Sequence, residues 1–193
     1  MRGQFFLLLL KPRGRAIKRK MIKNGSMRLI SCLLFASVLA LYADTIAGLK
    51  WTPPAGWKTD PAARPMRAAT YLIPSSPGDK DTGECAVYFF GEGQGGGIQA
   101  NLQRWQSQFQ GVAGKPAVSK TDKRSVHGMT VTTIDVSGTY SGMGGGSPKP
   151  GYRMLGAIVE GPGGNVFFKF TGPEKTVTAN QAKFDQMIAS VAK

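Results

Sequence analysis

The sequence predicts an α+β domain in which a mostly antiparallel β-sheet carries an internal helix and a C-terminal helix. Three observations lead to this class. Glycine and proline punctuate short segments that are rich in aromatic and β-branched residues, as in strands joined by turns. Two other segments repeat their apolar residues at helical spacing. Finally, the continuous apolar runs at 86–90 and 166–168 are typical of strands covered on both faces.

The predicted strands span residues 49–51, 67–73, 84–90, 129–140, 152–159 and 165–171. The last two form the clearest hairpin, because Gly-Pro-Gly-Gly at 161–164 lies between them. Within 129–140 the apolar positions shift parity between Val131 and Ile134. We therefore expect a β-bulge in that strand.

Each helix is predicted from one apolar stripe. The internal helix follows from Ile98, Leu102, Trp105 and Phe109, which fall on one helical face. The C-terminal helix follows from Val177, Phe184, Ile188 and Val191, which also share a face. Thr176 is predicted to cap this second helix, because a threonine hydroxyl can accept a backbone N–H of the first turn.

The N-terminal region predicts export. The formal net charge of +14 is concentrated in the first 28 residues, where basic side chains stand without acidic ones. An uncharged, largely apolar run follows and ends in small residues near Ala43, which is the order of a secretory signal. We divide the chain into a basic leader at 1–26, with Met21 and Met27 as alternative starts, a signal peptide at 27–43, and one globular α+β domain at 44–193. The predicted location is extracytoplasmic, either periplasmic or secreted.

Export limits the partners and the redox chemistry. Without its leader the domain carries no concentrated basic patch, so we predict no nucleic-acid partner. The apolar run is about 22 Å long as a helix, shorter than the roughly 30 Å hydrocarbon core, so we predict no membrane span in the mature form. An uncleaved signal anchor is the alternative. Cys85 is then the only cysteine, and we predict a small buried hydrophobe rather than a reactive thiol.

Several segments resemble a known group of proteins. Trp51-Thr-Pro-Pro-Ala-Gly-Trp57 resembles the W-x-x-P-x-G-W segment of small exported bacterial proteins of unknown function, and the segments at 101–109, 151–158 and 167–173 are similar to that group as well. Phe184-Asp-Gln-Met-Ile188, near the end of a strand-rich chain, resembles the PsbP-like α/β sandwich. The resemblance implies a role in binding or assembly more than in catalysis, although a fold does not determine a function.

Two motifs were weighed as cofactor or metal sites. The segment at 91–96 matches G-x-G-x-x-G, but its neighbouring strands are predicted to be antiparallel and no acidic residue follows at the required distance. We therefore expect a flexible connection and no cofactor. Asp79, Asp81 and Glu84 resemble the opening of a calcium loop, but Phe90 stands where the loop needs a bidentate glutamate. A solvated turn is the favoured interpretation, and the three acids are kept only as binding candidates without an assigned metal.

The internal helix carries a second stripe made of amides, at Gln99, Gln103, Gln106 and Gln110. This face is polar and almost uncharged. Amides both donate and accept hydrogen bonds, as recognition of a glycan or a peptide backbone requires. These four glutamines are therefore binding candidates, and an ordinary wetted helix face is the alternative.

Together these patterns predict an exported, non-enzymatic domain that binds an unknown protein or small ligand in the cell envelope or outside the cell. No catalytic residue is assigned, because no serine or cysteine lies in a recognisable nucleophile motif. The alternative is an envelope hydrolase whose site assembles only in three dimensions, from residues such as His127, Cys85 or the carboxylates.

Overall fold

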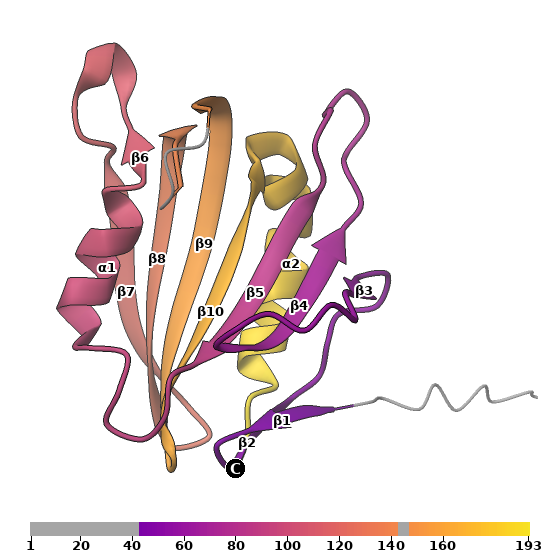
Figure 1. The fold of residues 1–193 in the computed structure, drawn as a ribbon, viewed down its shortest axis with the longest axis vertical. Helices are drawn as coiled ribbons and strands as arrows, with labels where there is room; N and C mark the ends of the chain where they lie inside the picture. Colours follow the sequence, from indigo (N-terminus) through magenta and orange to yellow (C-terminus); the bar gives the residue numbers. More distant parts are fainter. Residues whose placement is uncertain (1–42, 143–146) are drawn as a thin grey trace, which may run out of the picture. The chain divides into compact units, whose positions relative to one another are not determined.

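The structure is a computed structural model that describes residues 43–142 and 147–193 (Figure 1). It confirms the α+β class, because an eight-stranded antiparallel sheet carries an internal helix and a C-terminal helix. The predicted basic leader at 1–26, and the signal peptide as far as residue 42, lie outside the described residues. The domain boundary at residues 43 and 44 therefore remains a prediction.

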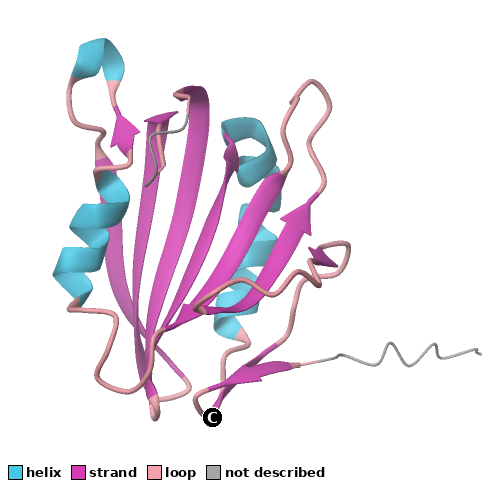
Figure 2. Ribbon diagram, in the orientation of Figure 1, coloured by secondary structure: helices cyan, strands magenta, loops and turns pink. Residues whose placement is uncertain are grey.

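The main sheet begins at a short edge strand (Figure 2). Its order is β3 (Lys58–Thr59), β4 (Arg67–Ile73), β5 (Gly83–Phe89), β10 (Gly164–Pro173), β9 (Lys149–Gly161) and β8 (Met129–Tyr140). At the far edge, β8 pairs with both β6 (Phe109–Gln110) and β7 (Ser119–Val126). A separate ribbon of β1 (Asp44–Ile46) and β2 (Leu49–Trp51) is tied to the C-terminus through Lys50 and Ala192.

All six predicted strands are present, and four others were missed. β1, β3 and β6 are only two or three residues long. β7 is longer, but nearly all of its side chains are exposed and many are charged, so it lacks the alternation that identifies a strand in a sequence. Such polar, lysine-bearing strands are typical of a solvated sheet edge.

The two helices cover opposite faces of the sheet. α2 (Glu174–Ala189) packs on β9 and β10, over a core that includes Trp51, Phe168 and Phe184. α1 (Ile98–Gln106) lies at the β8 side of the other face (Figure 1), where Trp105 is buried. Trp105 packs directly over Gly156 of β9, since a Cβ built on Gly156 would lie 2.5 Å from the indole ring. A larger residue at position 156 would therefore push α1 away from the sheet.

The bulge predicted between Val131 and Ile134 is wrong. β8 pairs with β9 without interruption from Val131 to Gly138, and the only shift in this pairing lies between Gly138 and Tyr140. Val131 belongs to the core beneath α2, whereas Ile134 belongs to the core beneath α1. Because both faces of β8 are covered, apolar side chains occupy both parities and imitate a register shift.

The prediction that Thr176 caps α2 is also wrong. α2 begins at Glu174, so Thr176 lies within its first turn. The carboxylate of Asp79 accepts the backbone N–H of Thr176 at 3.0 Å and the Thr176 hydroxyl at 2.5 Å. A loop residue nearly a hundred positions away therefore supplies the cap that was expected from within the helix.

The apolar stripes continue beyond both helices. α1 ends at Gln106, and Phe109 lies in β6, where it still packs in the same core. Val191 follows the end of α2 and is fully buried. Within residues 43–142 and 147–193, neither helix has the length and apolar character that crossing a membrane requires.

Candidate functional site

The most unusual chemistry of the described residues lies on the sheet face that carries α1. Lys169 occupies the middle of β10, in the interior of the sheet. Its paired neighbours across the sheet are Ala86 on β5 and Gly156 on β9. The ring of Trp105 covers Gly156. The structure therefore places an amine among apolar strands.

Lys169 is held by neutral groups. Its Nζ donates to Oε1 of Gln108 at 2.6 Å and to the hydroxyl of Tyr140 at 3.3 Å, and it lies 5.3 Å from the centre of the Tyr140 ring. Among the described residues it forms no ion pair. Burial lowers the pKa of Lys169 to about 8, with a smaller opposing effect from Glu84. Lys169 is thus a partly buried cation without a counter-ion.

Three tyrosines surround this amine. Tyr140 stacks on Tyr152 with ring centres 5.9 Å apart, and Tyr88 lies on the neighbouring strand β5. The guanidinium of Arg67 lies 5.4 Å from the centre of the Tyr88 ring. Burial raises the pKa of all three phenols, so their hydroxyls stay protonated at neutral pH. The face therefore offers hydroxyl donors beside a cation.

Charged groups line the rim of this face. Glu84 is paired with Arg64 and with Arg67, each at 3.0 Å. Asp81 accepts a hydrogen bond from the hydroxyl of Tyr152 and pairs with Lys149 at 2.8 Å. These hydrogen bonds, with that of Lys149 first, lower the pKa of Asp81. Each rim acid already has a cation, which leaves the charge of Lys169 uncompensated.

Two separate cavities border this cluster. The smaller, of about 60 Å³, lies between Lys169 and α1, where Arg104, Trp105 and Phe167 also line it. The larger and more open one, of about 460 Å³, is lined by Tyr140, Tyr152 and Thr171, among others. The hydroxyl oxygen of Thr171 is buried and has no hydrogen-bond partner among the described residues. Buried polar atoms usually have a partner, so this hydroxyl is an exception within the described structure. We call this region, defined by Tyr88, Gln108, Tyr140, Tyr152, Lys169 and Thr171, the Lys169 face.

The structure separates the three acidic binding candidates. Asp79 caps α2, whereas Asp81 and Glu84 lie on the rim of the Lys169 face. Among the described residues, no three His, Cys, Asp or Glu side chains converge as a metal site would require. Two of the three candidates thus border the site without forming a calcium loop.

The four candidate glutamines lie away from the Lys169 face. Gln99 and Gln103 are exposed on α1, and Gln110 is exposed on β6. The amide of Gln106 donates to the backbone oxygen of Ala117 at 2.7 Å. Gln103, Gln106 and Gln110 line an open cavity of about 480 Å³ beside the 111–118 loop.

Sequence reasoning missed both Lys169 and Gln108. The available signal was the run Val166-Phe-Phe-Lys169-Phe170, in which one lysine interrupts a strand already predicted to be covered on both faces. Charged residues are rarely buried in such a strand unless they are paired. Gln108 carried no comparable signal, because it falls outside the amide stripe and its burial depends on the tertiary fold.

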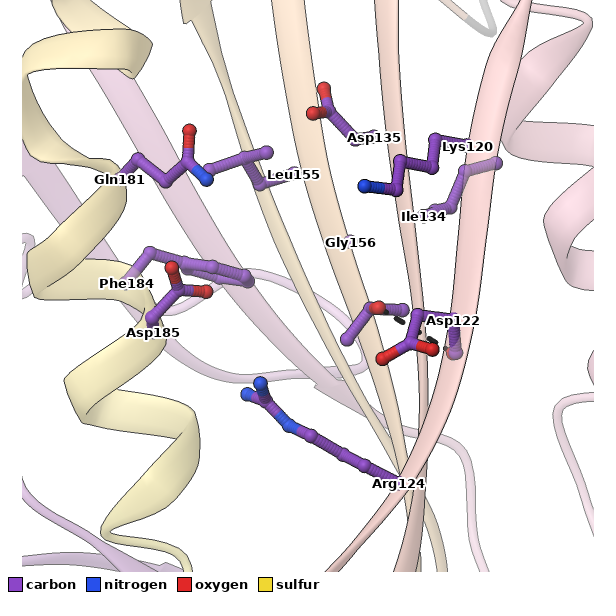
Figure 3. Close-up of a pocket in the computed structure, with 11 residues that line it drawn as sticks. Lys120, Asp122, Arg124, Ile134, Asp135, Leu155, Gly156, Gln181, Phe184 and Asp185 are labelled. Atoms are coloured by element: carbon purple, nitrogen blue, oxygen red, sulfur yellow. Dashed lines mark hydrogen bonds between the residues drawn. The ribbon is translucent and has the colours of Figure 1, made fainter.

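A second groove lies on the opposite face, between α2 and β7 (Figure 3). Its volume is about 240 Å³, and Leu155 and Phe184 form its apolar part. Lys120 and Arg124 project into it from β7 and Asp185 from α2 (Figure 3). Acidic and basic groups alternate around this groove, so it favours no single sign of ligand charge.

The residues named for a hydrolase do not assemble in the described structure. Nδ1 of His127 lies 2.7 Å from the backbone oxygen of Val191, and His127 has no hydrogen bond to Cys85 or to a carboxylate there. Cys85 is fully buried, and burial raises the pKa of its thiol well above the usual range. The prediction that Cys85 is a buried hydrophobe is consistent with this position.

No protein-family model and no curated protein matches this chain. Among solved structures, cyanobacterial PsbP (CyanoP) from Synechocystis sp. PCC 6803 matches at 14% identity and a TM-score of 0.49, covering 78% of this chain and 89% of that one. PA94 of Pseudomonas aeruginosa, a protein of unknown function, matches at 12% identity and a TM-score of 0.46, covering 79% and 96%. LpqN of Mycobacterium tuberculosis matches at 10% identity and a TM-score of 0.52, covering 75% and 82%.

These comparisons concern architecture. One of the matching structures is a PsbP protein, and another is described as a protein of unknown function. The overlap with LpqN shows a shared fold. At such low identity the likeness assigns no site residue.

Proposed function

We propose that this chain is an exported, non-enzymatic domain that binds a small anionic ligand at the Lys169 face. The observation that carries the proposal is an interior ammonium whose hydrogen-bond partners, Gln108 and Tyr140, are both neutral. Holding a cation away from water without a counter-ion costs free energy. A carboxylate or phosphate that enters beside Lys169 would offset this cost through a charge-assisted hydrogen bond.

The surroundings of Lys169 favour an anion over a neutral ligand. The phenol of Tyr140 stays protonated and can donate to a bound oxygen. Thr171 borders the larger cavity, and its buried hydroxyl has no hydrogen-bond partner among the described residues. Arg67 and Lys149 add positive charge at the rim, and their acidic partners are already paired. A small dicarboxylate or a phosphate monoester fits this arrangement of donors.

Two observations support export to the cell envelope. The order of basic, apolar and small residues up to Ala43 is that of a secretory signal. LpqN, with which the fold is shared, is described as involved in cell envelope biogenesis. N-terminal sequencing of the protein from its native host tests this part. We expect a mature start close to residue 44, whereas an intact N-terminus would contradict cleavage.

The buried position of Cys85 and the hydrogen bond between His127 and the backbone of Val191 favour a binding role over the hydrolase alternative. The glutamine face of α1 is a second candidate surface. Its support is the exposure of Gln99 and Gln103, and the open cavity beside Gln106. That surface suits a neutral glycan or a peptide backbone rather than an anion.

A thermal-shift panel tests the proposed ligand class. The purified protein is heated with acetate, succinate, citrate or inorganic phosphate, and with glucose as a neutral control, all at matched ionic strength. A ligand at one hundred times its dissociation constant stabilises the native state by about 2.7 kcal/mol. We expect an upward shift with at least one anion, and loss of that shift in Lys169→Met. The exposed lysine of β7 provides the matched control, Lys123→Met. Equal shifts in both variants would overturn the proposal.

A further inference from the structure

Lys169 differs from the other lysines whose contacts are described. Lys149 pairs with a carboxylate, and Lys175 and Lys183 donate to backbone oxygens at exposed positions. Lys169 instead stands in the interior of the sheet, with the faces and edges of aromatic rings around it. Burial lowers the pKa of Lys169, so a larger fraction of its side chain is the neutral amine. A neutral lysine amine in an apolar site is a nucleophile towards carbonyl carbon.

The smaller cavity gives a carbonyl compound a place to reach this amine. The space of about 60 Å³ beside Nζ holds only a few heavy atoms, because a liquid water molecule occupies about 30 Å³. Arg104 lines the same space and offers a cation to an anionic group of the ligand. A small carbonyl carbon could therefore contact Nζ while an attached anionic group faces Arg104.

The neighbours of Lys169 suit the chemistry of addition. Oε1 of Gln108 lies 2.6 Å from Nζ and can orient an N–H of the amine. The Tyr140 hydroxyl, 3.3 Å from Nζ, is a protonated donor that can bond to a carbonyl oxygen. Arg104, which lines the smaller cavity, can hold a carboxylate or phosphate of the same ligand. Within the part of the chain that the structure describes, no carboxylate is paired with Lys169 to keep it as an ammonium.

We propose that Lys169 forms a reversible imine with a small aldehyde or ketone that carries an anionic group. The lone pair of the neutral amine forms a C–N bond to the carbonyl carbon, and the carbonyl oxygen takes up a proton to give a carbinolamine. Loss of one water molecule, whose oxygen is the former carbonyl oxygen, leaves a C=N bond to Nζ. The amine and the carbonyl compound thus give the imine and water, with no oxidant or reductant. This inference rests on the anion-binding role proposed above and names the ligand class more narrowly.

Reductive trapping tests the inference on the unaltered protein. The protein is incubated with glyoxylate and sodium cyanoborohydride, and peptide mapping by mass spectrometry locates the adducts. We expect Lys169 to be modified at least tenfold faster than Lys149 or Lys123. Acetaldehyde, which lacks the anion, should lose most of this preference. Glyoxylate adducts spread evenly over the exposed lysines, with none at Lys169, would overturn the inference.

The variant Lys169→Arg separates this inference from the anion-binding proposal. A guanidinium keeps the positive charge but forms no imine under these conditions. A circular-dichroism melt first verifies that the variant is folded. We expect it to lose the adduct at position 169, while anion binding is judged on the wild type alone. Anion-dependent shifts in the wild type without trapping at Lys169 would reject the imine alone, whereas absence of both would reject both proposals.

Discussion

Nζ of Lys169 donates to Oε1 of Gln108 across 2.6 Å, and this contact joins the middle of the sheet to the segment that follows α1. Both side chains are largely removed from water. Among the described residues, the ammonium of Lys169 has no acidic hydrogen-bond partner. Positions that cost stability in this way are frequent at functional sites.

Replacing Lys169 with methionine should stabilise the fold at neutral pH. The folded-state pKa of about 8 lies below the ordinary value of 10.5, so below pH 8 the folded state carries a charge that its surroundings disfavour. The shift corresponds to a cost on the order of 3 kcal/mol, partly offset by the lost hydrogen bonds. The stability of the wild type should rise between pH 8 and pH 10.5, and the gain from Lys169→Met should shrink over the same window.

Urea denaturation at pH 7 and pH 10 measures this difference. At each pH, the neighbouring charged and titratable groups must have the same protonation state in the wild type and in the variant. These groups are Arg67, Glu84, Tyr88, Arg104, Tyr140, Lys149 and Tyr152. Lys123→Met supplies the control for a loss of exposed charge. A Lys169→Met variant that is less stable than the wild type at pH 7, with no change by pH 10, would contradict the account.

Anion affinity should weaken as the pH rises through about 8. Binding requires the ammonium form of Lys169, whose population falls about tenfold between pH 7 and pH 9 when its pKa is about 8. The dissociation constant for a fully ionised carboxylate should therefore rise roughly tenfold over this range, measured by isothermal titration calorimetry. In Lys169→Arg the affinity should stay flat, because a guanidinium does not titrate there. A pH-independent wild type would argue against Lys169 as the anion ligand.

Gly156→Ala should loosen α1 from the sheet. The added methyl group would lie 2.5 Å from the ring of Trp105 and 2.8 Å from Ile134. Such overpacking usually costs about 1–3 kcal/mol. The expected result is a lower urea midpoint together with a red shift of tryptophan fluorescence. Gly97→Ala is the matched control, because a Cβ there meets no atom within 4 Å and the backbone φ is negative. Equal stability of the two variants would rule out close packing of Trp105 on Gly156.

Asp79→Ala should destabilise the start of α2. Its carboxylate accepts both the backbone N–H and the hydroxyl of Thr176, and loss of such a cap typically costs about 1 kcal/mol. Lys80→Ala, an exposed change at the next position, provides the comparison. We expect a lower denaturation midpoint for Asp79→Ala alone. If calcium raised the stability of the wild type but not of Asp79→Ala, the residue would act as a metal ligand instead.

Cys85 should react with thiol reagents only when the domain unfolds. Its side chain is fully buried, and burial raises the pKa of the thiol, so the reactive thiolate is scarce in the native state. Labelling with iodoacetamide, followed at the Cys85 peptide by mass spectrometry, should be slow without urea and fast above the unfolding midpoint. Rapid native labelling would show that this thiol is exposed and would reopen the hydrolase alternative.

The fold could be predicted from the sequence where local patterns and tertiary packing agree. The hairpin of β9 and β10 follows from the turn at 161–164, and α1 follows from the stripe that contains Trp105. Prediction failed where the same pattern has two physical causes. The shift of parity between Val131 and Ile134 arises from burial on both faces rather than from a bulge.

The candidate site was much harder to predict, because its residues are distant in the chain. Gln108 and Lys169 meet only after α1 packs beside the sheet, and Asp79 reaches Thr176 only after the last helix docks. Helical spacing predicts a binding face at the glutamines 99, 103, 106 and 110. The buried amide that accepts a hydrogen bond from Lys169 is instead Gln108. A single charge inside a buried strand was the most informative local signal, and it stands at Lys169.

The most direct test of the central claim is an NMR titration of the ¹⁵N-labelled protein with an anion that stabilises it. The account predicts saturable shifts of the backbone amides around Tyr88, Gln108, Tyr140, Lys169 and Thr171, and loss of those shifts in Lys169→Met. Shifts confined to the groove of Lys120, Arg124 and Asp185, or to the glutamine face of α1, would contradict it and relocate the binding site.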